Sequence, residues 1–202
     1  SRRVIAIQHG EQIFTFSASF QEPEEGFEHQ VDMPEVPPPE SLADSTRPPD
    51  DVLERLPEKV RNFMLRERPF ELRRVEPIDV LQPHASAPLQ NVWLRAVDRL
   101  PDDDRLHRSL LAYVSDYNLL ATATLPHAIG ALDKGLVTAS LDHAMWFHRP
   151  FRVDDWLLYS MDSPSAGGAR GFTRGSVFTR DGRLVASTAQ EGLIRLVAKK
   201  PA

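Results

Sequence analysis

The chain contains no cysteine in its 202 residues. This absence excludes disulfide bonds, a thiolate nucleophile and cysteine-ligated metal sites together, and it fits a reducing compartment. The sequence also lacks any apolar run near the roughly 20 residues that a membrane-spanning helix needs, and no charged-then-apolar leader opens it. We therefore expect a cytoplasmic protein with no membrane partner.

Neither sign of charge dominates the sequence. Lys and Arg number 24 against 29 Asp and Glu, which leaves a formal net charge of -5, and the two signs are mixed along the chain. A nucleic-acid-binding surface would show as clustered basic residues, so we expect no nucleic acid partner. With 41% hydrophobic and 26% charged residues, the composition is that of a globular protein able to bury a sizeable core.

The first part of the chain predicts a hairpin followed by a linker. Residues 2–8 and 12–20 are β-rich and flank His9 and Gly10, where glycine permits a positive φ. Residues 21–49 shift to Pro, Glu, Asp and Ser, which cannot hold a helix or a strand ladder, so we expect an extended surface linker. A short helix is expected over residues 50–66, although Pro57 falls inside it.

A long helix is the central prediction for the rest of the chain. Residues 70–75 and 90–96 alternate like strands. Acidic residues at 102–104 then favour the positive, N-terminal end of a helix over residues 105–124. This helix is apolar around nearly its whole circumference, so we predict that it is buried. Asp116 lies inside this stretch. A buried carboxylate needs a partner or a role, and the alternative is an aspartate at the helix rim pointing into water.

Strands are predicted after this helix. Residues 135–150 alternate so that Ser140 and Asp142 share a small polar face, while His143 falls on the opposite, largely apolar face, which we expect to pack on the core. Three further strands are expected over residues 156–161, 170–180 and 183–197, with a small-residue loop at 163–168 and a hairpin turn at 181–182.

Together these elements predict an α+β protein with the hotdog fold, in which a long antiparallel sheet wraps around a central helix. The last hairpin repeats the pattern of the first, and each ends in a glutamine, Gln21 and Gln190. We therefore expect a tandem double hotdog whose first unit is incomplete, since its helix and early strands would precede Ser1. The expected domains are a hairpin of the first unit (1–22), a Pro-rich linker with a short helix (23–68) and a second hotdog domain (69–198).

Four long motifs carry a resemblance to a known family: ASFQEPEEGFEHQ, LDHAMWFHRPF, WLLYSMDSPSAGGARGFTRG and DGRLVASTAQEG. They resemble the type II acyl-CoA thioesterases (TesB-like), whose chains contain two hotdog units in tandem. The resemblance covers nearly the whole chain and is weakest in the linker. It implies hydrolysis of fatty acyl-CoA in the bacterial cytoplasm or in eukaryotic peroxisomes. Because residues 199–202 are not a peroxisomal targeting signal of the Ser-Lys-Leu type, we expect the protein to be cytoplasmic.

The resemblance also implies the catalytic residues. In the family, an aspartate, a threonine or serine, and a glutamine bind and orient the water that hydrolyses the thioester. Carried over by motif, they are Asp116 in YVSDYN, Ser140 in TASLDH and Gln190 in STAQEG. Asp116 and Gln190 match directly, and Ser140 keeps the hydroxyl where threonine is also common.

The chemistry of the residues agrees with this implication. Without cysteine or a Gly-x-Ser-x-Gly elbow, activated water is the simplest nucleophile. Partial burial would raise the pKa of Asp116 and suit it to accept a proton, while Ser140 and Gln190 would hold the water for attack. The amide of Gln190 and nearby backbone N–H groups would also be able to face the developing oxyanion, although a strand glutamine that only bonds a neighbour is common.

Other readings remain open at this stage. His143 and His148 lack the spacing of a metal site, so we expect no metal or other cofactor and a hydrogen-bonding role across the sheet. Arg170, Arg174 and Lys134 would be able to meet the phosphates of coenzyme A, but surface charges are usually only solvated, and no phosphate site is assigned.

Two alternative functions stand beside the thioesterase. A hotdog hydratase or dehydratase would need a histidine on the central helix near position 116, and His107 comes too early. A non-catalytic acyl-CoA-binding module remains possible because the first unit is incomplete. An apolar sheet face exposed by that unit would need cover, so the expected partners are acyl-CoA and further copies of the chain in a homo-oligomer.

Overall fold

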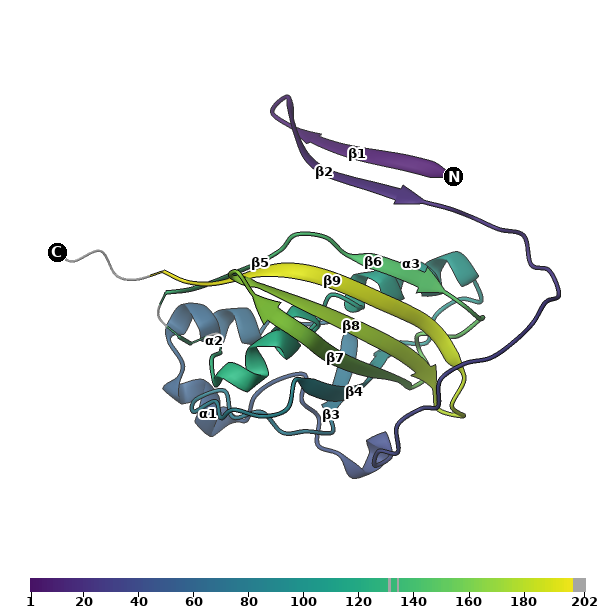
Figure 1. Ribbon diagram of the computed structural model, residues 1–202. Coiled ribbons are helices and arrows are strands. Elements are labelled where there is room, and N and C mark those ends of the chain that lie inside the picture. The colour runs from purple at the N-terminus through teal and green to yellow at the C-terminus, as the bar shows by residue number, and fades with distance from the viewer. Residues whose placement is uncertain (131, 134, 198–202) are drawn as a thin grey trace. The chain divides into compact units, whose positions relative to one another are not determined.

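The structure is a computed structural model that describes residues 1–130, 132–133 and 135–197 (Figure 1). It divides into two compact units, Ser1–Gln30 and Val31–Ala202, which are described separately. The expected domain boundaries at 22, 68 and 198 stay a prediction. No helix among the described residues has the length and apolar character needed to cross a membrane.

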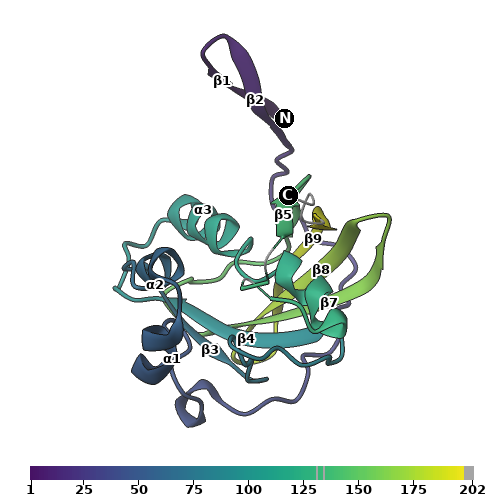
Figure 2. The same ribbon diagram turned by 90° about the vertical axis from the view of Figure 1, so that its left-hand side faces the viewer.

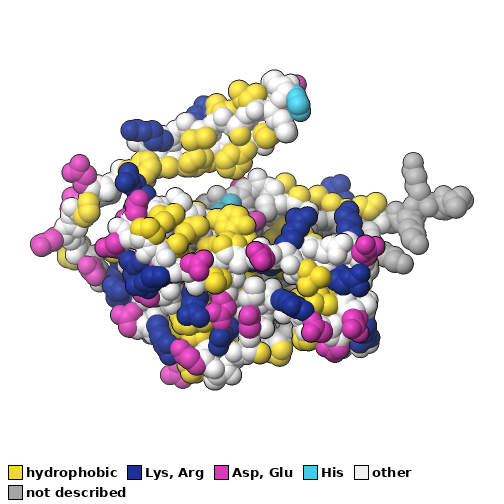
Figure 3. All heavy atoms as spheres, turned by 180° about the vertical axis from the view of Figure 1, so that it is seen from behind, with side chains coloured by type: hydrophobic (Ala, Val, Ile, Leu, Met, Phe, Trp, Pro, Cys, Tyr) yellow, Lys and Arg dark blue, Asp and Glu magenta, His cyan; other side chains and the backbone are white. Residues whose placement is uncertain are grey.

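The first unit is the predicted hairpin. Strands β1 (Arg2–Gln8) and β2 (Glu11–Ala18) pair antiparallel around a two-residue turn. His9 and Gly10 both have positive φ, 51° and 85°, as the turn that matches the strand twist requires. Hydrophobic side chains stay exposed on this unit, as Figure 3 shows: Val4, Ile5, Ile7, Ile13, Phe14 and Phe16.

The second unit begins at Val31, within the linker, and the rest of the linker packs on the domain that follows it. The Trp93 Nε1–H donates to the Pro37 carbonyl at 2.9 Å. Ser45 N donates to Leu72 O at 2.8 Å, and Leu72 N donates to Thr46 Oγ1 at 2.9 Å. Residues 21–38 and 42–49 contain no helix or strand, as predicted, but the 3-10 helix at Pro39–Ser41 contradicts the expectation that this stretch holds no helix. The linker supplies partners to an otherwise open strand edge.

Three short helices interrupt this linker: η1 (Pro39–Ser41), α1 (Asp50–Arg55) and α2 (Glu58–Met64). The single helix predicted over residues 50–66 is therefore wrong. Leu56 is extended and Pro57 caps the second helix, because proline has no N–H to continue the first one.

One antiparallel sheet forms the body of the second unit, in the order β3-β4-β7-β8-β9-β5, with β6 also paired to β9. Its strands are β3 (Phe70–Arg74), β4 (Leu89–Ala96), β5 (Leu136–Ser140), β6 (Ala144–Phe147), β7 (Leu157–Gly167), β8 (Arg170–Thr179) and β9 (Leu184–Leu196). Figure 2 shows the sheet curling from β3 to β9 with helix α3 (Asp104–Val114) on its concave side. This is the predicted hotdog fold.

The central helix is shorter than the predicted helix over residues 105–124. Helix α3 ends at Val114, and a separate 3-10 helix, η2 (Leu120–His127), follows after a turn. Asn118 in that turn has φ +64°, which a right-handed helix cannot include. The expectation of burial all round is also wrong, because the buried residues of α3 are His107, Leu111 and Val114 on one face.

Two glycines let η2 lie against the sheet. Gly171 and Gly192 are paired across β8 and β9. A Cβ on Gly171 would lie 2.6 Å from the Ala123 Cβ, and one on Gly192 would lie 2.5 Å from the Leu120 side chain. The small residues in these strands therefore set the close approach of η2 to the sheet.

Two other local predictions are wrong. The strand predicted over 135–150 is two strands, β5 and β6, and β5 packs neither face on a core because its residues from 137 to 140 are exposed. The loop predicted at 163–168 is mostly strand, with a bulge after Asp162 and a tight turn at Gly168 and Ala169. The positive φ of these two turn residues, 58° and 60°, allows the small-residue stretch to form a hairpin.

Candidate active site

Three side chains from separate parts of the second unit converge at the end of α3. Gln190 Nε2 donates to Asp116 Oδ1 at 2.6 Å and to Ser140 Oγ at 3.0 Å, and Ser140 Oγ donates to Asp116 Oδ1 at 3.4 Å. Asp116 lies in the turn after α3, Ser140 ends β5, and Gln190 lies in β9. The structure therefore brings together all three of the residues named from the sequence.

The amide of Gln190 has one orientation that fits this geometry. Turning it over would place Oε1 against the Asp116 carboxylate, so Nε2 must face the two acceptors. Both amide hydrogens are then used, which leaves Gln190 no N–H for a developing oxyanion in this arrangement. Its Oε1 is buried and has no hydrogen-bond partner among the described residues.

The three residues differ in exposure. Gln190 is fully buried, whereas Asp116 and Ser140 are exposed. Asp116 lies beyond the helix instead of within its buried face, so the partial burial expected from the sequence is not found. The triad therefore runs from a buried donor to a carboxylate that solvent reaches.

Tyr159 anchors the Asp116 turn from the sheet. Its hydroxyl donates to Ser115 O at 2.9 Å and lies 2.8 Å from Thr188 Oγ1. Burial raises the pKa of Tyr159 well above its ordinary value of 10, which keeps the phenol a donor. Gly175 makes room for the ring, since a Cβ there would lie 2.3 Å from Tyr159 Cε2.

Arg74 holds the other end of the same turn. Its guanidinium donates to Gln90 Oε1 and to Asn118 Oδ1. Gln90 Nε2 in turn donates to Asn118 O at 3.2 Å and to Thr122 Oγ1 at 2.7 Å. Burial lowers the pKa of Arg74 to about 10, so the group is still a cation at neutral pH and holds Asn118 in its left-handed conformation.

The two histidines of the 135–150 region have different roles. His148 Nε2 lies 2.9 Å from Ser187 Oγ on the neighbouring strand, which confirms the predicted bond across the sheet. His143 Nε2 lies 2.9 Å from Ser115 Oγ, at the end of α3, so the same prediction is wrong for His143. No cluster of three or more His, Cys, Asp or Glu side chains suited to a metal occurs in the described part of the chain.

The residues considered for coenzyme A phosphates form no common site in the structure. Arg170 pairs with Glu191 at 3.3 Å and Arg174 pairs with Asp162 at 2.5 Å, and all four side chains are at least one-third exposed. Lys134 and the tail at 199–202 lie outside the described residues. The phosphate-binding residues stay unassigned.

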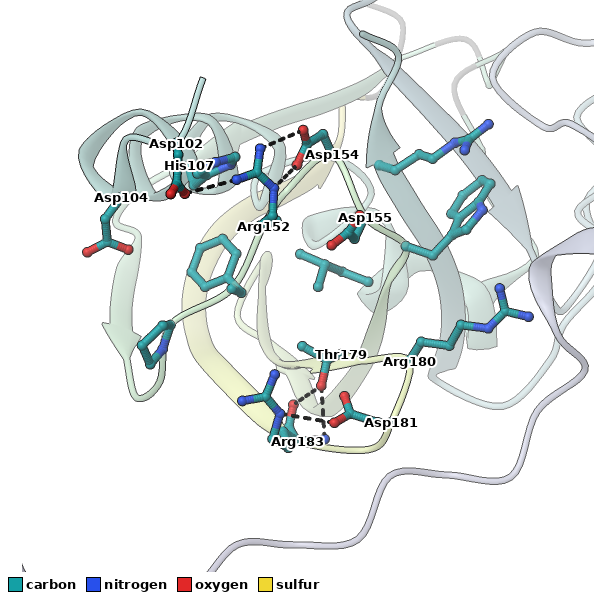
Figure 4. A pocket seen from close by; sticks show the side chains of 15 residues that line it. Asp102, Asp104, His107, Arg152, Asp154, Asp155, Thr179, Arg180, Asp181 and Arg183 are labelled. Carbon is teal, nitrogen blue, oxygen red and sulfur yellow. Dashed lines mark hydrogen bonds and ion pairs between the residues drawn. The ribbon is translucent and has the colours of Figure 1, made fainter. Parts of the chain in front are cut away.

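A separate polar cavity of about 720 Å³ lies at the other end of α3 (Figure 4). Arg152 bridges Asp102 at 3.0 Å and Asp154 at 3.1 Å. Burial opposes the charge of Asp154, but its bonds from Arg152 and the Leu100 N–H outweigh burial and lower its pKa to about 2. Asp116, Ser140 and Gln190 do not line this cavity. Its carboxylates therefore belong to a network apart from the triad.

Sequence reasoning missed the groups that hold the triad in place. Ser115 precedes Asp116 directly and Asn118 follows it by two residues, and this closeness in the sequence was the available signal. Arg74 and Tyr159 lie in distant strands, and no spacing in the sequence links them to Asp116. Only the curvature of the sheet around α3 brings them to the turn.

Comparisons with known proteins agree with the fold and indicate the family. The family model described as "Acyl-CoA thioesterase" matches residues 61–193. Acyl-CoA thioesterase 2 of Haemophilus influenzae is 42% identical over 192 residues, which are 95% of this chain and 67% of that protein. Acyl-coenzyme A thioesterase 8 of Mus musculus is 44% identical over 203 residues, 96% of this chain and 63% of that protein.

A solved structure extends the likeness to three dimensions. The acyl-CoA thioesterase II TesB2 of Mycobacterium marinum is 44% identical with a TM-score of 0.76, over 98% of this chain and 69% of that one. The chain thus spans about two thirds of the length of these relatives. By the family model, the sequence identity and the fold, the chain belongs to the acyl-CoA thioesterase family.

Proposed function

We propose that this protein hydrolyses fatty acyl-CoA to the free acid and coenzyme A, using water oriented by Asp116, Ser140 and Gln190. The observation that carries the proposal is the convergence of a carboxylate, a hydroxyl and an amide within 3.4 Å of one another. The names of the two curated relatives and of the solved structure support acyl-CoA as the substrate class.

Asp116 and its two uncharged partners have different roles in this proposed hydrolysis. The Asp116 carboxylate accepts a proton from a bound water, and the water oxygen attacks the thioester carbonyl carbon. The carbon–sulfur bond then breaks, and coenzyme A leaves as a thiolate that takes up a proton. Gln190 and Ser140 hold Asp116 in place with uncharged donors, and so fix the direction in which the carboxylate meets the water. Donors for the oxyanion must come from other N–H groups.

The first experiment measures free coenzyme A thiol released from short- to long-chain acyl-CoAs. We expect Asp116→Asn to lower kcat by about 100-fold to 10,000-fold, because an amide accepts no proton. Asp155→Asn is the matched control, since Asp155 is 62% exposed and lies in the separate polar network. Equal turnover by the wild type and Asp116→Asn would remove Asp116 from the mechanism.

Two alternatives predict other results in this assay. A non-catalytic binding module would bind acyl-CoA and release no thiol. A hydratase or dehydratase would hydrate or dehydrate the acyl chain without releasing thiol, using a histidine on the central helix. His107 is buried, and its Nδ1 accepts the Val153 N–H at 3.2 Å, which argues against that role.

We also propose that the protein forms a homo-oligomer and is cytoplasmic. Exposed hydrophobic side chains on the second unit support the first proposal: Val137, Leu141, Trp146 and Phe147. Size-exclusion chromatography with light scattering tests it, and a well-behaved monomer would contradict it.

The cytoplasmic location rests on the lack of cysteine, and cell fractionation is its test.

A further inference from the structure

A bulge separates β5 from β6 beside the active site. Ser140 pairs with Gly192 and Ala144 pairs with Ala189, so residues 141–143 lie opposite residues 190–191. Leu141 N and Asp142 N both donate to Glu191 O, at 2.9 Å and 3.3 Å. One extra residue on one strand defines a β-bulge, and bulges re-aim the side chains that follow them.

The bulge changes the direction of His143. In a regular strand, Ser140 and His143 would point to opposite faces. In the structure Ser140 contacts Asp116, and His143 contacts Ser115, which directly precedes Asp116 in the chain. The extra residue therefore brings both side chains to the end of α3.

The hydrogen bonds determine which ring nitrogen of His143 carries the proton. Ser115 Oγ donates its only hydrogen to Ala112 O at 2.9 Å. It must therefore accept from His143 Nε2, which lies 2.9 Å away. The neutral ring is thus the Nε2–H tautomer, and Nδ1 carries a lone pair.

We propose that His143, as the neutral Nε2–H tautomer, is a positioning residue for thioester hydrolysis, which holds Ser115 and through it the Asp116 carboxylate against Gln190 and Ser140. This inference rests on the proposed function. Ser115 is fully buried and is also held by Tyr159 through its carbonyl. His143 supplies a second hydrogen bond to the Ser115 hydroxyl, besides the bond that this hydroxyl donates to Ala112 O.

Protonation of His143 would disturb this arrangement. Among the described residues, the charged groups that act on the ring are Asp116 after α3 and Asp142 in the bulge, while Tyr159 from β7 is a neutral phenol. Burial lowers the pKa of His143 below its ordinary value of 6.5, against the pull of both carboxylates. The ring is therefore neutral at pH 7 and above. An imidazolium carries a hydrogen on Nδ1 as well, which would attract Asp116 away from Gln190 as the pH falls below 6.5.

The chain offers a matched control for His143. His148 makes a contact of the same kind, with Nε2 2.9 Å from Ser187 Oγ, and burial lowers its pKa too. Ser187 lies three residues before Gln190 in β9, so the two side chains point to opposite faces of the strand. A general effect of losing a histidine that contacts a serine hydroxyl would appear in both variants.

The experiment compares His143→Gln, His143→Phe and His148→Gln in the full chain, with folding checked by circular dichroism. Glutamine places an amide N–H near the position of Nε2 but does not titrate. We expect His143→Phe to lower kcat by about 10-fold to 100-fold with KM nearly unchanged. His143→Gln should keep most of the activity and flatten its loss below pH 6.5, whereas His148→Gln should keep the wild-type kcat and pH profile.

Two kinetic results would overturn the proposal. One is a kcat of His143→Phe equal to that of His148→Gln. The other is a loss of activity below pH 6.5 in His143→Gln that is identical to the loss in the wild type. A wild type that releases no coenzyme A at all would instead remove the proposed function, and the role of His143 with it. Nitrogen-15 NMR of the histidine rings gives a readout that does not depend on turnover. It should show the Nε2–H tautomer at pH 7.5, and an Nδ1–H tautomer would refute the assigned hydrogen bond.

Discussion

The two ends of helix α3 each hold a carboxylate, but in opposite ways. At the N-terminal end, the Asp154 side chain is 1% exposed and is bound by Arg152, Arg99 and a backbone N–H. At the C-terminal end, Asp116 is exposed, and its hydrogen-bond partners among the described residues, Gln190 and Ser140, are uncharged. Both positions are polar, and both side chains are ordered by hydrogen bonds.

The difference shows that the charge of the neighbouring groups decides whether a carboxylate stabilises the fold or takes part in the chemistry. Cationic partners hold the pKa of Asp154 at about 2, so this group accepts no proton near neutral pH and only stabilises the fold. Neutral donors orient Asp116 without neutralising its charge, which leaves its basicity available to a bound water. The comparison predicts that changes at one end affect activity and changes at the other affect stability.

The largest effect should follow from Gln190→Glu, which replaces the neutral partner of Asp116 with a carboxylate. A buried carboxylate at position 190 would repel the Asp116 carboxylate at the present 2.6 Å between the position 190 side chain and Asp116 Oδ1, so one must take a proton or the pair must separate. We expect kcat/KM at pH 8 to fall by about 100-fold or more, and part of the activity to return at lower pH, where a shared proton restores a donor. The pH dependence of coenzyme A release measures both effects.

The control for this variant is Gln90→Glu, which places a carboxylate at a buried glutamine beside the Arg74 guanidinium instead of beside Asp116. It should lose less activity than Gln190→Glu, because the cation compensates the new charge. Full activity of Gln190→Glu at pH 8 would show that the neutrality of the partner does not matter.

The next effect concerns stability at the other end of the helix. Since the pKa of Asp154 is lowered from 3.8 to about 2, its contribution is complete above pH 3.8 and is lost as the pH falls towards 2. This contribution is no more than about 2 kcal/mol. Asp154→Asn should reduce the free energy of unfolding at pH 7 by that order and weaken its dependence on pH between 4 and 2.

Urea unfolding at several pH values measures this change. Asp155→Asn should leave the free energy of unfolding at pH 7, and its dependence on pH between 4 and 2, nearly unchanged, because the Asp155 side chain is 62% exposed. If Asp154→Asn abolished turnover while the protein remained folded, the proposed separation between the two ends of α3 would be wrong.

The smallest effect should come from the cap of α3. Asp103 accepts the Arg105 N–H at 3.0 Å, so Asp103→Ala removes one partner of the first helical turn. We expect Tm to fall by about 3 °C and kcat to stay at the wild-type value. Asp103→Ser keeps an acceptor at the cap and should restore most of Tm in differential scanning calorimetry. Loss of activity in Asp103→Ala without loss of folded protein would again contradict the comparison.

Local sequence patterns predicted which strands and helices form better than they predicted the residues at which these elements begin and end. Strands β1, β2, β4, β8 and β9 follow from alternation and turn residues, and the structure confirms them. The helix predicted to Thr124 ends instead at Val114, because the left-handed turn at Asn118 depends on Arg74, a partner more than 40 positions away in the chain. The loop predicted at 163–168 is a hairpin, because the facing strand β8 supplies partners to its small residues.

The sequence by itself determined the chemistry that is present: one aspartate, one serine and one glutamine in long, specific motifs, with no thiol to compete with water. It also determined the order of strands and helix, because hydrophobic period and turn residues are local properties. Only the tertiary structure decided that Asp116 lies beyond the helix and faces solvent, and that its hydrogen-bond partners among the described residues are uncharged. The bulge that turns His143 towards Ser115 likewise depends on the register between β5, β6 and β9, which pairing across the sheet sets and spacing along the chain does not.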